Sequence, residues 1–172
     1  MAGISKDQVT WPLLFMYFKR LIRNFAMFVS DIPHEARAKL VLIEASGEMI
    51  KAARLLTSGP DILLVHDHEG VLRGVVTKTD VVRQISMCQG AACRGSVSEV
   101  MSKDVMLCHE EDSLHDVSLR MKARHIKNIP LVDDMNRPIG LLTARAILRT
   151  LLGEAEEAEA QMVGYVSGVG YR

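Results

Sequence analysis

Apolar and polar positions follow the same order twice along this chain. Each copy begins with an extended apolar piece, at 39–44 and 104–109, followed by apolar positions spaced three to four apart, which predict a helix with one buried face. Two short apolar runs, separated by a turn rich in Gly, Asn and Asp, then predict a pair of strands. A last helix is expected over 79–85 and 144–152. The pattern therefore predicts β-α-β-β-α in each copy.

The two copies also correspond residue by residue. The stretch GVVTKTD at 74–80 corresponds to GLLTARA at 140–146, and VSDI at 29–32 corresponds to VSEV at 97–100. The matched pieces keep the same order, and small length differences fall between them, where loops tolerate them. We therefore expect an N-terminal segment at 1–28, a first repeat at 29–87, a linker at 88–96, a second repeat at 97–152 and a C-terminal extension at 153–172.

Composition and length favour one globular unit made of both copies. The chain has 172 residues, of which 48% are hydrophobic, enough to build a buried core. Neither copy is long enough to bury two faces alone, so the two sheets should pack against each other. The expected fold class is α+β, with the cleft between the repeats as the natural ligand site.

Three pieces of sequence carry a resemblance to a known family. They are VSEVM at 97–101, ARHIKNIPLVDD at 123–134, and the closing pattern Gly-x-x-Thr-x-x-Asp, which is complete at 74–80 and lacks its aspartate at 140–146. In this order, and duplicated, they resemble tandem cystathionine-β-synthase (CBS) domains, the paired unit called a Bateman module. The resemblance covers about 29–152. It implies a module that binds an adenosine nucleotide or a related adenosyl compound between the repeats, signals to a partner, and pairs as a homodimer.

The sequence Thr-x-x-Asp directly after a strand has two interpretations, a helix cap and a ligand site. As a helix start, Thr77 caps the first free N–H groups, and Asp80 places a negative charge in the first turn, where it is favoured. As a ligand site, the same free N–H groups and hydroxyl suit a phosphate. The resemblance implies the second role too, with Asp80 holding a ribose and Thr77 facing the phosphates.

The second copy keeps Thr143 but has Ala146 in place of the aspartate. We interpret the threonine as a cap that both helices need, and the aspartate as a group needed only where a ribose binds. The sequence therefore predicts one competent nucleotide site per chain, with the second site degenerate, empty or selective for another ligand. Because a charge-assisted hydrogen bond contributes about 1.5 to 3 kcal/mol, losing Asp80 should weaken binding about ten- to a hundredfold.

Other site residues follow from the resemblance alone. It implies that the first strand and the segment before the second strand enclose the base, and that cations near the helix starts neutralise phosphates. For the base these are Leu42, Ile43, Pro60, Asp61 and Ile62 in the first repeat, and His125, Lys127, Asn128, Ile129 and Pro130 beside Thr143 in the second; for the phosphates they are Lys78, Arg124, Lys127 and Arg145. Ordinary core and turn positions, or solvated surface charges, are the alternative for each.

Charge and cysteine content narrow the function classes. Twenty-one basic and 21 acidic residues leave no net charge to hold nucleic acid or an anionic membrane, so we expect neither as a partner. Three cysteines in a chain of this length predict reduced thiols and a cytoplasmic location. The apolar stretch near the N-terminus is interrupted by Lys19, Arg20 and Arg23, which argues against a signal peptide and against a membrane span.

Metal and catalytic motifs are weak. Adjacent side chains in His66 to His68 would point to opposite faces of a strand, which makes a poor chelate. The stretch 108–112, CHEED, offers a thiol near acidic residues, yet no third group would orient them. We therefore expect no metal, no catalytic residues and no catalytic cofactor.

Six of the eight aromatic residues lie between Trp11 and Phe28. With neighbouring Leu and Ile residues they form a stripe at helical spacing, which predicts an N-terminal amphipathic helix. Such a helix would pack on its own module or across a dimer. The alternatives are a docking helix for a separate effector protein, at 11–29, or an anchor on a membrane surface.

The leading functional hypothesis is a stand-alone regulatory sensor. It would bind AMP, ADP, ATP or S-adenosylmethionine between the repeats and change the shape of the dimer or its affinity for a partner. The alternative from another class is a ligand-free scaffold that dimerises and docks through the aromatic helix. An enzyme with a thiol or metal site is a third and weaker hypothesis.

Overall fold

The structure is a computed structural model that describes residues 27–87, 95–153 and 156. The expected aromatic helix up to residue 26, most of the linker, and nearly all of the C-terminal extension lie outside the described residues.

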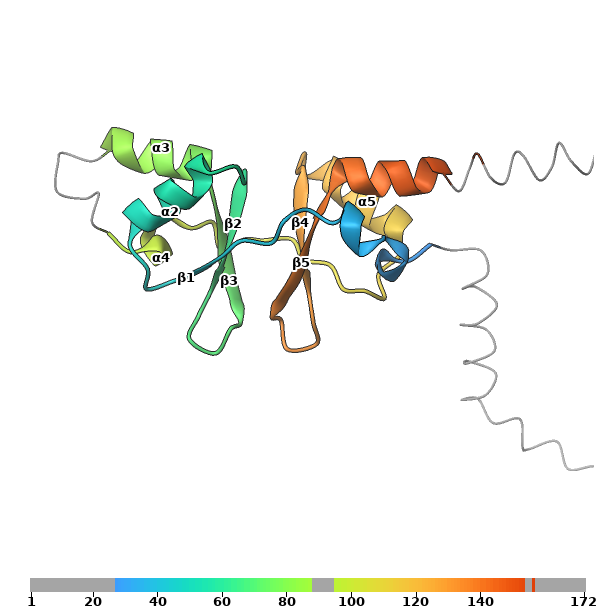
Figure 1. Ribbon diagram of the computed structural model, residues 1–172, viewed down its shortest axis with the longest axis horizontal. Helices are drawn as coiled ribbons and strands as arrows, with labels where there is room; N and C mark the ends of the chain where they lie inside the picture. The colour runs from blue at the N-terminus through green and yellow to red at the C-terminus, as the bar shows by residue number, and fades with distance from the viewer. Residues whose placement is uncertain (1–26, 88–94, 154–155, 157–172) are drawn as a thin grey trace, which may run out of the picture.

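Two halves lie side by side, with their sheets facing each other and their helices on the outer sides (Figure 1). The first half contains β1 (Leu42–Glu44), α2 (Met49–Thr57), β2 (Ile62–His66), β3 (Leu72–Thr77) and α3 (Lys78–Met87). The second contains α5 (Leu114–Ala123), β4 (Asn128–Val132), β5 (Pro138–Thr143) and a helix at 144–153. Three short helical turns complete the set: η1 (Val29–Asp31), η2 (His34–Ala36) and α4 (Val97–Val100). The predicted α+β class with two packed repeats is confirmed.

The two sheets differ by one strand. In the first half, β1 runs parallel to β2, and β2 is antiparallel to β3. In the second half β4 and β5 pair alone, and the expected strand at 104–109 is reduced to a single bridge between Cys108 and Leu131. Proline explains the difference: Leu64 donates its N–H to the Val41 carbonyl at 3.0 Å, whereas its counterpart, Pro130, has no N–H to donate.

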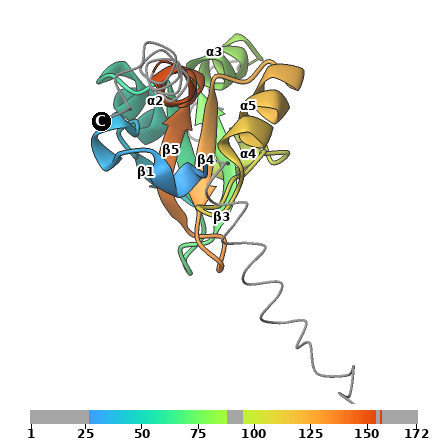
Figure 2. The same cartoon turned by 90° about the vertical axis from the view of Figure 1, so that its right-hand side faces the viewer.

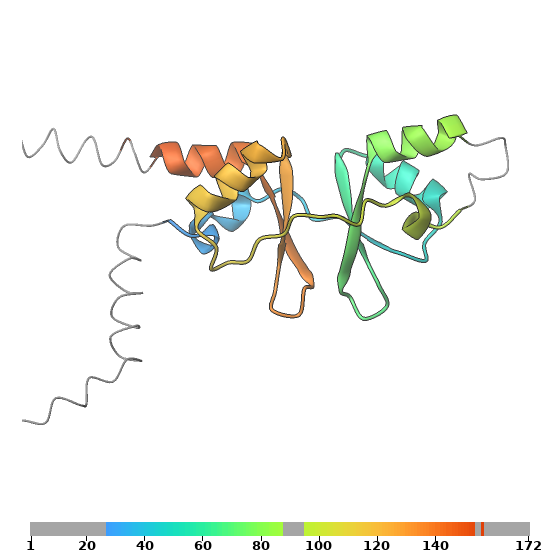
Figure 3. The same cartoon turned by 180° about the vertical axis from the view of Figure 1, so that it is seen from behind.

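The opening segment of each repeat packs on the opposite half. Val29 and Ile32 are buried in the core of the second half, together with Leu114 and Val117 of α5. Val97, the counterpart of Val29, is buried in the core of the first half. The chain therefore crosses between the halves twice, at 37–42 on the front (Figure 1) and at 101–108 on the back (Figure 3).

Glycine is required where the second crossing meets β3. Ser102 exchanges backbone hydrogen bonds with Val75, at 3.0 and 2.9 Å. A Cβ atom on Gly74 would lie 2.7 Å from the Ser102 carbonyl oxygen and 2.8 Å from the Met101 sulfur. The first glycine of the repeated motif thus leaves room for the crossing chain.

The halves meet through apolar side chains and through their hairpins. Ile62, Leu64 and Leu141 form a shared buried cluster between the two sheets. At the hairpin turns, the N–H of Leu72 donates to the carbonyl of Asn136 at 2.9 Å. Figure 2 shows the two turns next to each other at the lower end of the molecule. The apolar cluster and the hydrogen bond between the hairpin turns together hold the two sheets against each other.

Candidate functional site: a cleft between the repeats

A cleft of about 730 Å³ lies between the two halves. One wall is the crossing segment 38–42, here called the strap, and the other is formed by the end of α2 and the approach to β2. The full lining is Ala38, Lys39, Leu40, Val41, Leu42, Leu55, Ser58, Gly59, Pro60, Asp61, Ile62, Asn128, Leu141 and Thr143. This volume falls within the usual range for small-molecule sites. We call it the strap cleft.

Backbone hydrogen bonds fix the strap at both ends. The N–H of Ala38 donates to the carbonyl of Leu141 at 2.9 Å, on the second half, and the Val41 carbonyl accepts from Leu64 on the first half. Between these points the backbone groups of Lys39 and Leu40 have no hydrogen-bond partner among the described residues. The middle of the strap is therefore not paired with either sheet.

The strap cleft combines the two repeats in a way that the sequence did not indicate. We expected Pro60 to Ile62 to serve the same site as Thr77 and Asp80, and 125–130 to lie beside Thr143 in a separate site. In the structure Pro60, Asp61 and Ile62 line one cleft with Asn128 and Thr143 of the other repeat. This grouping follows from the crossed packing, because the strap of one half lies along β5 of the other.

Thr77 and Asp80 form a closed cap at the start of α3. The Asp80 carboxylate accepts hydrogen bonds from the Thr77 N–H at 2.8 Å and from the Thr77 hydroxyl at 2.7 Å. The Asp80 N–H donates to the Thr77 hydroxyl oxygen at 3.3 Å. Arg83 lies one turn on, with a guanidinium nitrogen 3.7 Å from the other carboxylate oxygen. Only 8% of Asp80 is exposed, and among the described residues the Arg37 side chain, 9% exposed, is similarly buried.

The second repeat keeps half of this cap. The Thr143 hydroxyl accepts from the N–H of Ala146 at 3.0 Å, and Ala146 is also 8% exposed. The threonine therefore caps both helices, as the sequence predicted. An apolar methyl group occupies the place that the Asp80 carboxylate has in the first repeat.

The remaining predicted site residues fall into two groups, and neither lines the strap cleft. Ile43, Ile129 and Pro130 are buried core residues, so their side chains serve packing. The charged and polar ones are exposed: His125, Lys127, Arg124, Arg145 and Lys78. Two of these cations already have acidic neighbours, since Lys78 lies 3.0 Å from Asp61 and Arg124 lies 3.5 Å from Asp104.

Sequence reasoning missed the strap as a wall of the cleft. Ala38 to Val41, Leu55, Ser58 and Leu141 also line the cleft. Most of the strap lies within the apolar piece 39–44, which we expected to form one strand, whereas in the structure the strand covers only Leu42–Glu44. The strap's crossing to the other half depends on tertiary packing and leaves no local pattern.

Two other candidate motifs are structural. The Cys108 thiol is buried and donates to the Pro130 carbonyl at 3.4 Å, and burial, with the nearby Asp112 charge, raises its pKa to about 12. The His66 ring nitrogen Nδ1 lies 2.7 Å from the carbonyl oxygen of Asp67. No set of three metal-ligating side chains gathers within 27–87 and 95–153. No helix among the described residues has the length and apolar character needed to span a bilayer.

Comparison with known proteins supports the fold described above. Residues 97–153 match the family model of the CBS domain. An L-aspartate semialdehyde sulfurtransferase of Methanocaldococcus jannaschii is 26% identical over 126 residues, which cover 73% of this chain and 23% of that protein. The chain spans about a quarter of the length of this relative, so the relative's activity belongs to a larger protein.

Two solved structures share the architecture. The CBS domain pair of protein MJ0100, in complex with 5-methylthioadenosine and S-adenosyl-L-methionine, superimposes with a TM-score of 0.61 at 24% identity, covering 75% of this chain and 98% of that one. The cytosolic domain of the Mg²⁺ channel MgtE, in complex with ATP, gives a TM-score of 0.56 at 21% identity, covering 64% and 44%. The fold is therefore that of a CBS domain pair. Residues 97–153 form a CBS domain, and the first half has the fold of another.

Proposed function

We propose that this protein is a regulatory module that binds an adenosine-type ligand between its two repeats and has no catalytic activity of its own. The observation that carries the proposal is the Asp80 carboxylate, which is buried, charged and held in a fixed orientation at the start of α3. A carboxylate fixed in this way can accept both hydroxyl groups of a ribose, and charge-assisted hydrogen bonds of this type are strong.

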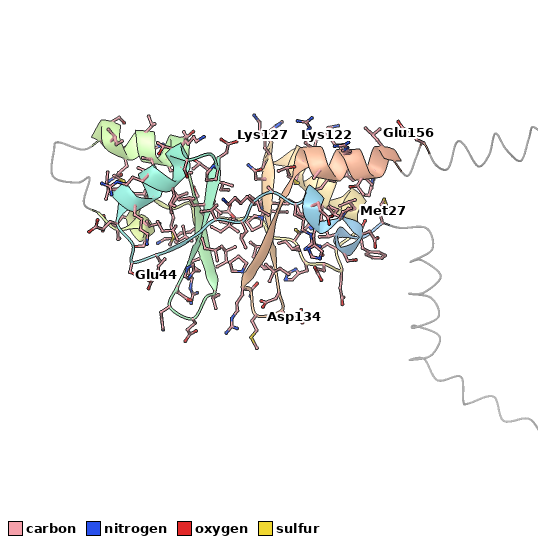
Figure 4. All side chains as sticks on the ribbon, in the orientation of Figure 1. Met27, Glu44, Lys122, Lys127, Asp134 and Glu156 are labelled. Atoms are coloured by element: carbon pink, nitrogen blue, oxygen red, sulfur yellow. The ribbon has the colours of Figure 1, made fainter. Side chains whose placement is uncertain are left out.

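The crossed arrangement of the strap cleft suggests which residues would face Asp80. The counterpart of Thr143 is Thr77, the counterparts of Pro60 to Ile62 are residues 126–128, and the counterpart of the strap is the rear crossing at 102–107. A ligand held by Asp80 would then contact 102–107 and 126–128. Lys127, at the upper end of β4 beside the junction of the halves (Figure 4), would lie within reach of its phosphates.

The similar structures support this class of ligand. Two of them are complexes, one with 5-methylthioadenosine and S-adenosyl-L-methionine and the other with ATP. These compounds share an adenosyl group and differ in what is attached to it. The adenosyl group, and the ribose diol within it, is therefore the part we assign to Asp80, while the choice among AMP, ADP, ATP and S-adenosylmethionine is left to experiment.

The output of binding would be a change in how the halves or two chains meet. Segments that cross between the halves pair with β5 at Ala38 and with β3 at Val75, so a ligand bound beside either crossing would alter the packing between the halves. We propose a homodimer as the responding unit, with residues 11–29 as the place where a separate effector protein docks. Without ligand binding, the same features would describe a scaffold.

Isothermal titration with AMP, ADP, ATP and S-adenosylmethionine tests the proposal. One of them should bind the natural protein near one per chain, and Asp80→Ala should weaken that binding about ten- to a hundredfold. Asp116→Ala is the matched control, because Asp116 also lies in the first turn of a helix but away from the halves' junction, and it should leave affinity unchanged. Equal affinity in Asp80→Ala would refute the role of Asp80, and no binding of any of the four would favour the scaffold.

A further inference from the structure

We infer that the front crossing of the chain is releasable: the strap can detach from β5 while the rear crossing stays in place, and an ion pair between Arg37 and Glu110 acts as its latch. This inference concerns the chain alone and involves no ligand, so its failure would leave the proposed function untouched. It follows from comparing the two crossings, which occupy corresponding places in the two repeats but differ in chemistry.

The front crossing, at 37–42, makes fewer backbone hydrogen bonds to the opposite sheet than the rear crossing, at 101–108. Within the described residues, the front crossing donates a single one to β5, from Ala38 to the carbonyl of Leu141 at 2.9 Å. The rear crossing and β3 exchange two, between Ser102 and Val75, at 3.0 and 2.9 Å (Figures 1 and 3). Detaching the front crossing therefore breaks fewer hydrogen bonds, which favours local opening on that side.

The front crossing also packs less closely on its strand. A Cβ atom added to Gly74 of β3 would lie 2.7 Å from the Ser102 carbonyl oxygen and 2.8 Å from the Met101 sulfur, both in the rear crossing. At Gly140 of β5, the corresponding Cβ would lie 3.8 Å from the front crossing, at the Cδ atom of Arg37. The front crossing can therefore leave its strand with a smaller loss of close contacts.

An ion pair holds the front crossing where two apolar side chains hold the rear one. Both Nη atoms of Arg37 lie 3.4 Å from the Oε1 atom of Glu110. The corresponding residues in the other repeat are Met101 and Ala45, which are partly buried against the core of the first half. In each pair, one residue directly precedes the bridge to the strand, and the other accepts a backbone N–H from the opening helical turn of the other repeat.

The ion pair is a weaker lock than the apolar pair. The Arg37 side chain is only 9% exposed, and its Nε makes no hydrogen bond to any described residue, whereas the Glu110 side chain is 48% exposed. A buried donor without a partner, and a carboxylate open to water and salt, offset much of the attraction between the two charges. Met101 and Ala45 carry neither cost, so opening is expected at the front crossing first.

Release would leave the two halves joined. The carbonyl of Val41 accepts from Leu64 at 3.0 Å, so the strap stays attached to the first half beside β1. The rear crossing and the hydrogen bond from Leu72 to Asn136 at the hairpin turns still connect the halves. The movement would open the wall of the strap cleft that 38–42 forms, and would give the protein two arrangements that differ on one side only.

Amide hydrogen exchange tests the inference, because Ala38 and Ser102 each donate a backbone N–H across the junction and so report on the two crossings. After correction for intrinsic rates, Ala38 should exchange about tenfold faster than Ser102 or more. The ratio of the two rates should rise when salt is raised from about 0.05 M to about 0.5 M, because screening weakens the ion pair. Equal protection of the two amides would refute a releasable strap.

Two variants test the latch itself. Glu110→Gln removes the negative charge at nearly constant size and should raise the ratio about two- to fivefold. Glu111→Gln is the matched control, because Glu111 is exposed in the same loop and forms no ion pair with a described residue, and it should leave the ratio unchanged.

The double variant Arg37→Met with Glu110→Ala copies the apolar pair of the rear crossing. It should lower the ratio about tenfold, because the apolar pair needs no partner for a buried donor. An unchanged ratio in Glu110→Gln, or a ratio that does not fall in the double variant, would refute the ion pair as the latch.

Discussion

The Thr77 hydroxyl lies 2.7 Å from the carboxylate of Asp80, and the Thr77 N–H lies 2.8 Å from the same oxygen. The pair closes the start of α3 and at the same time holds the buried Asp80 carboxylate in place. A single side chain therefore serves both helix capping and, in the proposed function, ligand binding. The two roles make separate predictions.

Removing the carboxylate should destabilise the protein even without ligand. Asp80→Ala eliminates both hydrogen bonds from Thr77, so the free energy of unfolding should fall by about 1 to 2 kcal/mol. Urea denaturation followed by circular dichroism measures this change. Asp116→Ala, in the exposed first turn of α5, should change stability by less than about 0.5 kcal/mol. If Asp80→Ala left the free energy of unfolding unchanged, the cap would not be maintained in solution.

The two motif glycines should respond differently to alanine. At Gly74 the new Cβ would meet backbone, the Ser102 carbonyl oxygen at 2.7 Å, so the rear crossing must shift and stability should fall by about 2 to 3 kcal/mol. At Gly140 the nearest atom is the flexible end of Leu131 at 3.2 Å, so the loss should be below about 1 kcal/mol. Denaturation midpoints of the two variants compare them directly, and equal losses would contradict the close approach at Gly74.

Cys108 should not react with alkylating reagents in the folded protein. Burial raises the pKa of its thiol to about 12, so almost no thiolate is present at pH 8. Treatment with iodoacetamide at pH 8, followed by peptide mass spectrometry, should leave Cys108 unmodified until denaturant is added. Labelling of Cys108 in the native protein at the rate of a free thiol would show that the core of the second half opens readily.

The hairpin turn of the first half should lose support in acid. Loss of solvent raises the pKa of Asp67, but hydrogen bonds from Val71, Arg73 and Glu69 outweigh this and lower it below the ordinary value for aspartate. A lowered pKa means that the carboxylate's stabilising effect is complete above about pH 4 and is lost as the pH falls through the native pKa.

Comparison with Asp67→Asn isolates this effect. The natural protein should be more stable than the variant at pH 7, and the difference should shrink as the pH is lowered below about 4. Thermal unfolding of both proteins, followed at pH 7 and at pH 2, measures this difference in stability. A difference that stays constant from pH 7 to pH 2 would rule out the ionised carboxylate as its cause.

The internal repeat made most of the fold predictable. Matching 74–80 with 140–146 gave the order of strands and helices in both halves, because the same local pattern occurs twice and each copy needs a partner surface. The helix caps at Thr77 and Thr143 could also be predicted from the sequence. A threonine hydroxyl between a strand and a helix accepts a hydrogen bond from a backbone N–H only three residues further on. Local rules succeed for these features because neighbours in sequence create them.

The composition of the cleft was not predictable for the opposite reason. Pro60 and Thr143 face one cleft although 82 intervening residues separate them, and the strap reaches it by crossing to the other half. The strand predicted at 104–109 is reduced to one bridge at Cys108. This difference could have been foreseen from the sequence, because Pro130 has no N–H to extend the pairing. Long-range pairing of segments, unlike capping, depends on how the halves pack.

Amide chemical-shift mapping tests the proposed adenosyl site most directly. Isotope-labelled protein would be titrated with whichever of AMP, ADP, ATP and S-adenosylmethionine binds most tightly. The proposal predicts that the largest shifts occur at Thr77 to Asp80 and, from the other repeat, at 102–107 and 126–128, and that Asp80→Ala abolishes them at the same ligand concentration. Shifts confined to the strap and to Pro60 to Ile62, or to the hairpin turns, would contradict it.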